Sequence, residues 1–278
     1  MDYTYPSIGF KILSLKNFQD RCLASKVICK INEIEDFMPK KFDVFQPLKR
    51  NYSPSDISEV IDVWMNDKMN QECLKEEYAE GLLLMKASSR SKASYMVTWK
   101  NENTIHFNFF SFSVNTEYLK QKNNLDKFLD LSKEFIHLLE PVQGEIVNES
   151  FPGAFKPLDL TIRHPELQWM NFFGKPYIDL FGKEKLLSAP AYRVESLGSN
   201  VIAIQTTDNV FEPIPDTVRE KIKRYLGENA FVWNGKRAWD YNKKTDNIAP
   251  HFNFSEVFFD KNKPIIEPQI WKRKKNNE

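Results

Sequence analysis

Glycine is scarce in this sequence, with nine residues among 278. Tight phosphate-binding loops depend on glycine because their backbone must approach the phosphate closely. Neither the P-loop pattern GxxxxGK[ST] nor the dinucleotide fingerprint GxGxxG occurs, and no GxSxG nucleophile elbow is present. The sequence therefore does not support a nucleotide-binding enzyme of these classes or an α/β-hydrolase.

Cysteine is also rare, and Cys22, Cys29 and Cys73 form no CxxC pair and no even disulfide framework. This pattern predicts reduced, structural cysteines. No apolar run approaches the length of a membrane span, and the first 18 residues lack the basic and apolar regions of a signal peptide. We therefore expect a cytoplasmic protein with no membrane partner.

Neither sign of charge is in excess, since 39 Lys and Arg oppose 38 Asp and Glu. A dedicated nucleic-acid binder normally carries a basic surplus, so no nucleic-acid partner is expected, and a highly acidic DNA mimic is equally disfavoured. What is abundant is apolar and aromatic material, 41% and 14% of the chain, including 22 Phe. Such a chain can bury an aromatic core as one large domain or two small ones.

Residues 1–150 are predicted to form an N-terminal α+β half. Apolar residues recur at helical spacing in residues 55–69 and 125–139, which predicts an entry helix and a long helix ended by Pro141. Strand-length apolar runs bounded by polar turns predict strands, with a three-stranded antiparallel meander in the middle. The predicted strands are residues 8–15, 24–31, 81–87, 93–100, 104–114 and 144–148. Residues 37–47 are expected to be irregular.

Residues 151–165 contain three prolines and a glycine and are predicted to connect this half to a C-terminal one, residues 166–278. The second half is expected to begin with a strand (169–173), followed by a helix with Pro176 in its first turn. A hairpin turning at Gly198-Ser199-Asn200 follows. The remaining elements are a helix at 216–226, a short strand at 231–233 and an aromatic tail.

The predicted fold class is therefore α+β, with an antiparallel sheet or sheets and helices packed on one face. The two halves could be related copies of one α+β unit. They could form two domains or one compact domain.

Candidate catalytic groups are few, and we predict no catalytic residue, no metal site and no cofactor. The four histidines, His106, His137, His164 and His251, are far apart in sequence. His137 has Glu134 one turn before it and Glu140 about one turn after, which suits either a carboxylate-oriented base or an ordinary charged helix surface. His106 is expected to be a satisfied sheet histidine, and His164 to lie in a loop.

Two other groups of residues are candidates for binding. The basic cluster Arg219, Lys221, Lys223 and Arg224 is predicted to form the solvated outer face of a helix. Arg, Trp and Tyr dominate protein–protein hot spots, so Arg237, Trp239 and Tyr241 are the predicted partner-binding residues. The alternative is a tail strand that packs onto the sheet through its rings.

The segment from Trp169 to Tyr192 carries a family resemblance. Its Trp, Asn, Gly, Leu, Pro and Tyr positions resemble the core of bacterial immunity proteins found beside polymorphic and type VI secretion toxins, and the named group is the immunity protein 52 family. The entry helix, the aromatic strand and the long helix follow in that family's order, over residues 40–235. The matched positions, which look structural, are Trp169, Asn171, Gly174, Tyr177, Gly182, Leu187, Pro190 and Tyr192.

The resemblance implies a non-catalytic antidote that binds a cognate toxin and blocks it sterically. The alternative is an α+β enzyme or small-ligand-binding protein whose site is assembled from distant residues such as His106, His137 and Glu134. That alternative predicts a deep pocket with convergent polar groups and a perturbed histidine.

Overall fold

The computed structural model describes residues 6–66, 79–101, 106–121, 123–151, 159–232 and 248–257. Its strands form one antiparallel sheet in the order β3-β2-β4-β5-β6-β1-β7-β8-β10-β9. The strands are β1 (Ser7–Ser14), β2 (Lys41–Asp43), β3 (Arg50–Asn51), β4 (Ala79–Lys86), β5 (Ser94–Asn101), β6 (Asn108–Asn115), β7 (Pro141–Asn148), β8 (Met170–Gly174), β9 (Arg193–Leu197) and β10 (Val201–Gln205). The predicted α+β class is confirmed.

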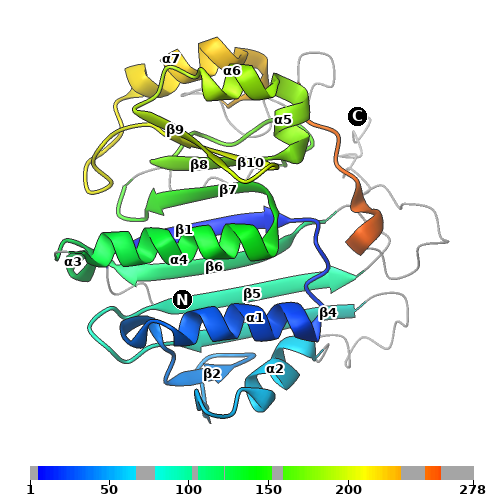
Figure 1. The fold of residues 1–278 in the computed structure, drawn as a ribbon, viewed down its shortest axis with the longest axis vertical. Coiled ribbons are helices and arrows are strands. Elements are labelled where there is room, and N and C mark those ends of the chain that lie inside the picture. The colour runs from blue at the N-terminus through cyan, green and yellow to red at the C-terminus, as the bar shows by residue number, and fades with distance from the viewer. Residues whose placement is uncertain are drawn as a thin grey trace, which may run out of the picture.

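The sheet continues from the first half of the chain into the second through β7 and β8, which pair with Gln143 opposite Phe173. Helices follow the strands along its length (Figure 1). They are α1 (Arg21–Asn32), α2 (Ser58–Met65), α3 (Thr116–Leu119), α4 (Asn124–Leu139), α5 (Lys175–Phe181), α6 (Lys183–Leu187) and α7 (Asp216–Leu226), with 3₁₀ turns η1 (Glu35–Phe37), η3 (Glu228–Ala230) and η5 (Phe254–Val257).

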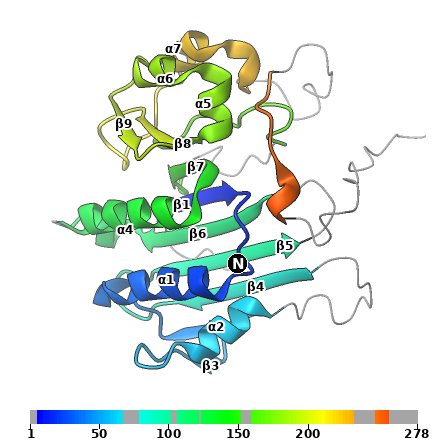
Figure 2. The ribbon, with the colours of Figure 1, turned by 45° about the vertical axis from the view of Figure 1, so that its right-hand side comes forward.

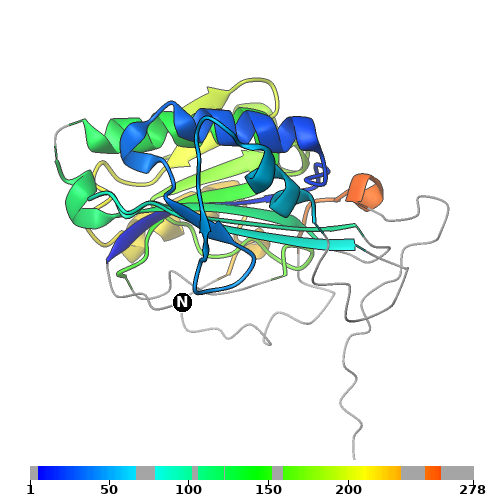
Figure 3. The same ribbon diagram turned by 90° about the horizontal axis from the view of Figure 1, so that it is seen from below.

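The larger core lies between the first-half strands and helices α1, α2 and α4, which cover one face of the sheet (Figure 3). Phe110 of β6 packs on Phe135 of α4 with ring centroids 4.7 Å apart, and Phe112 packs on Phe128 at 5.0 Å. Tyr95 stacks on Phe112 from the neighbouring strand. The alternation of side chains along each strand thus places an aromatic layer directly beneath α4.

A second core lies on the opposite face, at the β8–β10 end. Successive residues of a strand point to opposite faces, and Phe172 belongs to the first core whereas Phe173 belongs to the second. The same holds for Ala203 and its neighbours Ile202 and Ile204. Helices α5, α6 and α7 cover this second core and gather around β8–β10 (Figure 2). Each half therefore has its helices on one face, but the two faces are different.

The prediction of a strand at residues 24–31 is wrong, because these residues lie in helix α1. Asp20 caps the helix by accepting hydrogen bonds from the backbone N–H groups of Cys22 (2.7 Å) and Leu23 (3.1 Å). The buried positions recur at helical spacing and face the sheet and α4. They are Leu23, Ala24, Val27, Ile28 and Ile31.

Other boundaries differ from the sequence predictions by smaller amounts. Helix α2 begins at Ser58, because Asp56 holds the preceding turn through a hydrogen bond from the Ser58 N–H (3.0 Å). Strand β7 begins at Pro141, three residues before the predicted start, and Glu140 turns the chain with a φ of 47°. Residues 37–47 are expected to be irregular, but residues 41–43 form strand β2, which lies next to the edge strand β3. In place of the strand at 231–233, Phe231 makes an isolated bridge to His164, and Trp233 lies outside the described residues.

Among the helices that the structure describes, none has the length and apolar character needed to cross a membrane. Cys22 and Cys29 are free and exposed on α1.

Candidate functional site: a groove beside an edge strand

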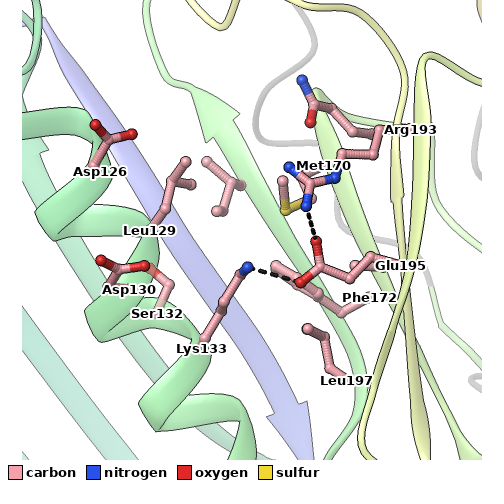
Figure 4. A pocket seen from close by; sticks show the side chains of 13 residues that line it. Asp126, Leu129, Asp130, Ser132, Lys133, Met170, Phe172, Arg193, Glu195 and Leu197 are labelled. Carbon is pink, nitrogen blue, oxygen red and sulfur yellow. Dashed lines mark hydrogen bonds and ion pairs between the residues drawn. The ribbon is translucent and has the colours of Figure 1, made fainter.

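The candidate site is a hollow of about 200 Å³ between helix α4 and strand β9 (Figure 4). Its floor consists of side chains from neighbouring strands that the sheet register aligns in rows. One row runs Ile146, Met170, Gln205, Arg193, and the next runs Phe172, Ala203, Glu195. Because most of the floor is apolar, a partner side chain that enters the hollow would lose contact with water.

The groove exists because helices leave this part of the sheet open. On this face α4 packs over the first-half strands and β7, while α5, α6 and α7 pack on the opposite face of β8 and β10. The floor residue Ala203, which pairs with Phe172, has a small side chain and leaves space between Phe172 and β9.

An ion-paired bridge crosses the groove from α4 to β9. The Nζ of Lys133 lies 2.7 Å from Oε1 of Glu195, and a guanidinium nitrogen of Arg193 lies 2.8 Å from Oε2 of the same carboxylate. Figure 4 shows both cations pointing toward Glu195. The Glu195 carboxylate thus forms ion pairs with two cations, one through each of its oxygens.

Two further carboxylates, Asp126 and Asp130, border the groove from α4. Both side chains are exposed, and neither makes an ion pair with any residue that the structure describes. They stand four residues apart on one face of the helix, with Leu129 beside them (Figure 4). This part of the rim is therefore acidic, in contrast to the bridge, where two cations share one carboxylate.

The sheet ends at β9, which pairs only with β10 within the described residues. An end strand exposes one row of backbone N–H and C=O groups that can pair with another chain. Tyr192, the residue before β9, is 63% exposed, and the side chain of Arg193, the first residue of β9, is also 63% exposed. The groove therefore lies next to a backbone edge that another protein can reach.

A buried polar cluster lies in the second core, behind β8. Lys223 of α7 forms an ion pair with Glu166 at 2.8 Å and donates to the carbonyl oxygen of Val232 at 2.7 Å. Burial lowers the pKa of Lys223, and the nearby Glu166 carboxylate opposes this effect. The expectation that Lys223 lies on a solvated outer helix face is wrong, because the second core covers it. Arg219 is also half-buried and donates to the carbonyls of Leu167 and Ile214.

His164 is buried beside this cluster, among the rings of Phe173, Tyr177 and Phe231. Its Nδ1 lies 2.8 Å from the carbonyl oxygen of Pro165. Burial lowers the pKa of the imidazole to about 4, so it is neutral at pH 7. This histidine is perturbed, as the ligand-site alternative required, but it lies in an aromatic core and not among the residues that line the groove.

The three residues named for that alternative have separate neighbours. Nε2 of His106 lies 2.7 Å from the carbonyl oxygen of Lys100, in the β5–β6 connection. Glu134 pairs with Lys30 of α1 at 3.3 Å. His137 is exposed on the last turn of α4. Within the described residues, no group of three or more His, Cys, Asp or Glu side chains is placed to hold a metal ion.

Two of the family-motif residues, Asn171 and Gly174, have structural roles at strand β8. Asn171 is fully buried; its side chain accepts from the N–H of Gln168 (2.8 Å) and donates to the Gln168 carbonyl (2.9 Å), which closes a local loop before β8. A Cβ at Gly174 would overlap the carbonyl oxygen of Pro141 on β7, so the close approach of the two strands there requires glycine.

The other motif residues divide into buried and exposed positions. Trp169 and Tyr177 are buried, and Gly182 ends α5 with a φ of 87°. Pro190 is half-buried, whereas Leu187 is 40% exposed. The predicted partner-binding residues Arg237, Trp239 and Tyr241 lie outside the described residues.

The groove is not evident from the sequence pattern, although two signals for it are present. Asp126, Asp130 and Lys133 fall at i, i+4 and i+7 on the polar side of a predicted helix. Arg193 and Glu195 alternate in a predicted strand and therefore share a face. What brings these sets together is the position of β9 in the sheet, which local pattern does not reveal.

Fold and groove together define an α+β protein built on one long antiparallel sheet, with an open groove at its β9 end. No family model matches the chain, and no curated protein matches its sequence. The resemblance to the immunity protein 52 family therefore stays a prediction.

Among solved structures, the fold is similar to that of the Pseudomonas aeruginosa T6SS protein PA0821. The TM-score is 0.50, with 11% sequence identity, and the match covers 80% of this chain and 73% of that one. At this identity, the likeness shows a shared fold.

Proposed function

We propose that this chain is an immunity protein of a type VI secretion context, which binds a cognate secreted effector toxin and neutralises it without catalysis of its own. The observation that carries the proposal is the groove between α4 and β9, an apolar floor beside an exposed sheet edge. Binding proteins use such a combination because a strand edge provides backbone hydrogen bonds while a neighbouring pocket selects side chains.

The type VI context of the proposal has two supports. One solved structure with a similar fold is that of a T6SS protein. The motif positions from Trp169 to Tyr192 resemble immunity proteins found beside such toxins. Fold alone does not define function, so the proposal depends on the groove for its mechanism and on these two likenesses for its setting.

In this proposal, the toxin covers the β9 end of the sheet and leaves the opposite edge, β3, free. The chain's contribution is a preformed surface: the sheet register aligns the floor side chains, and the Lys133–Glu195 ion pair joins α4 to β9. A surface that is already ordered loses little conformational entropy on binding, which favours a tight complex.

Co-expression tests the proposal. The chain is produced with the product of the adjacent gene in a host that the latter poisons, and complex formation is measured with an inactivated form of that product. The expected results are restored growth and a stoichiometric complex that survives gel filtration. If the chain neither restores growth nor binds, the proposed function is wrong.

Hydrogen–deuterium exchange locates the interface. In the complex, the amides of β9 and of the first half of α4 are expected to exchange more slowly than in the free protein. The amides of β3, at the other end of the same sheet, serve as the internal control and are expected to be unchanged.

A further inference from the structure

The groove rim carries more negative than positive charge. It has three carboxylates (Asp126, Asp130 and Glu195) and two cations (Lys133 and Arg193). Both cations form ion pairs with Glu195. The carboxylates that have no cation of their own are therefore Asp126 and Asp130, both on the α4 side of the groove, among the residues that the structure describes.

The two aspartates are also well placed to act together. Residues four apart on a helix lie about 5–6 Å apart at their Cβ atoms, so one guanidinium or ammonium group can approach both carboxylates. Leu129 lies beside them and the apolar floor continues to Met170 and Phe172. A cation at this position would have carboxylates on one side and apolar surface on the other, which strengthens the charge interaction by excluding water.

We propose that the groove binds an extended segment of a partner protein that places a Lys or Arg between Asp126 and Asp130 and a neighbouring apolar side chain on the Met170–Phe172 floor. The proposal rests on the proposed function, since it specifies the partner chemistry of the same site. Charge complementarity selects the cation, and the volume of about 200 Å³ limits the apolar group to one or two side chains.

The first experiment measures the affinity of the inactivated toxin for the double variant Asp126→Asn/Asp130→Asn by calorimetry. We expect the dissociation constant to rise at least roughly tenfold, with a weaker dependence on salt concentration. The matched control Glu35→Gln/Asp208→Asn removes the same charge at exposed positions that do not line the groove and is expected to stay within about twofold of wild type.

Two further variants separate charge from folding. Asp126→Glu/Asp130→Glu keeps both carboxylates and is expected to retain most of the affinity, whereas Asp130→Lys is expected to weaken binding more than the double Asn variant. Thermal unfolding of each variant shows whether the fold is intact. Wild-type affinity in the double Asn variant would overturn this inference while the proposed function stands.

A peptide probe tests the inference even when no toxin complex forms. Amide NMR signals of the isotope-labelled chain are followed during titration with acetyl-Val-Leu-Arg-Leu-Val-amide. The same peptide with citrulline in place of Arg, and argininamide alone, are the matched probes.

Shifts at residues 126–130 and 193–197 that occur with the Arg peptide, and that the double Asn variant abolishes, support the inference whatever the toxin experiment shows. Equal shifts with the citrulline peptide would overturn the cation requirement. Equal shifts with argininamide would overturn the requirement for a protein segment and indicate a small cationic ligand. No shift with any probe, together with no toxin complex, would remove both proposals.

Discussion

Lys223 shows how the environment of one residue can depart from its sequence pattern. In sequence it belongs to a basic run on an amphipathic helix, yet it is buried against Glu166 and the carbonyl of Val232. Glu166 lies 57 residues away, and periodicity within α7 carries no information about it. Buried charges persist only when paired and hydrogen-bonded, so this pair fixes the segment around Glu166 against α7.

His164 gives a testable pH dependence at the residue scale. Burial lowers its pKa to about 4, whereas an unfolded chain has a histidine pKa near 6.5. Between these values the unfolded state binds a proton that the native state does not, so His164 reduces stability as pH falls from 6.5 to 4. The full effect is about 3 kcal/mol, from 1.36 kcal/mol per pKa unit.

We therefore expect His164→Phe to remove this loss. Urea unfolding at pH 7.5 and pH 4 measures the free energy of unfolding of both proteins. On going to the lower pH, the free energy of unfolding of the variant is expected to rise by about 3 kcal/mol relative to that of wild type. Phenylalanine suits the surrounding aromatic rings. His137→Gln, changed at an exposed position, is the control and is expected to follow wild type. If the free energy of unfolding changed equally with pH in wild type and in His164→Phe, the lowered pKa of His164 would be contradicted.

The comparison with a variant is necessary because a second group, Glu145, changes stability with pH in the opposite direction to His164. Burial raises the pKa of Glu145 on β7 to about 7, and the nearby Lys11 partly opposes the shift. The native state then binds the proton more readily between about 4.5 and 7, so Glu145 reduces stability as pH rises through this window. The wild-type pH profile is thus a sum, and the His164 contribution appears only in the difference.

At the scale of elements, helix α1 explains the clearest failure of sequence analysis. Its apolar residues include Val27, Ile28 and Ile31, whose β-branched side chains favour strands in isolation. Packing against the sheet and α4 outweighs this preference, and Asp20 supplies the capping hydrogen bonds. The signal was present in the Asp20 cap and the helical spacing, but eight apolar-rich residues also suited a strand.

The Asp20 cap leads to a prediction for this element. Asp20→Ala leaves two N–H groups of the first turn without a side-chain acceptor, and we expect a loss of about 1 kcal/mol in the free energy of unfolding. Chemical denaturation measures the change. Lys26→Ala, at an exposed position within the same helix, is expected to change stability by a few tenths of a kcal/mol. Equal effects of the two substitutions would show that the cap does not stabilise α1.

At the scale of the whole molecule, one sheet joins two cores that lie on opposite faces. Phe172 and Phe173 are adjacent in β8, yet the first belongs to the core on the α4 side of the sheet and the second to the core on the α5 side. A strand that is fixed on both faces cannot leave one core without disturbing the other. Gly174 tightens this link, because its strand lies against the backbone of β7 at Pro141.

We therefore expect the chain to unfold in one cooperative transition. Urea titration followed by far-UV circular dichroism and by tryptophan fluorescence should give the same midpoint, since tryptophans of both halves, Trp64, Trp99 and Trp169, report on the first core. Two separated transitions, or midpoints that differ between the probes, would show that the halves unfold independently.

The sequence by itself determined the α+β class, the three-stranded meander, the long helix α4 and the β9–β10 hairpin. These elements depend on local chemistry: periodic apolar residues, Gly and Pro at element ends, and a Gly/Asn turn. The sequence also placed the charged residues of α4 on one side of that helix and those of β9 on one face of that strand.

Only the tertiary structure decided that β9 ends the sheet, that the helices of the two halves cover opposite faces, and that α4 and β9 enclose a groove. These features arise from pairing between strands far apart in the chain. β1, for example, lies between β6 and β7, more than 90 residues away. The order of strands depends on the combined burial of all of them, and no local pattern records it.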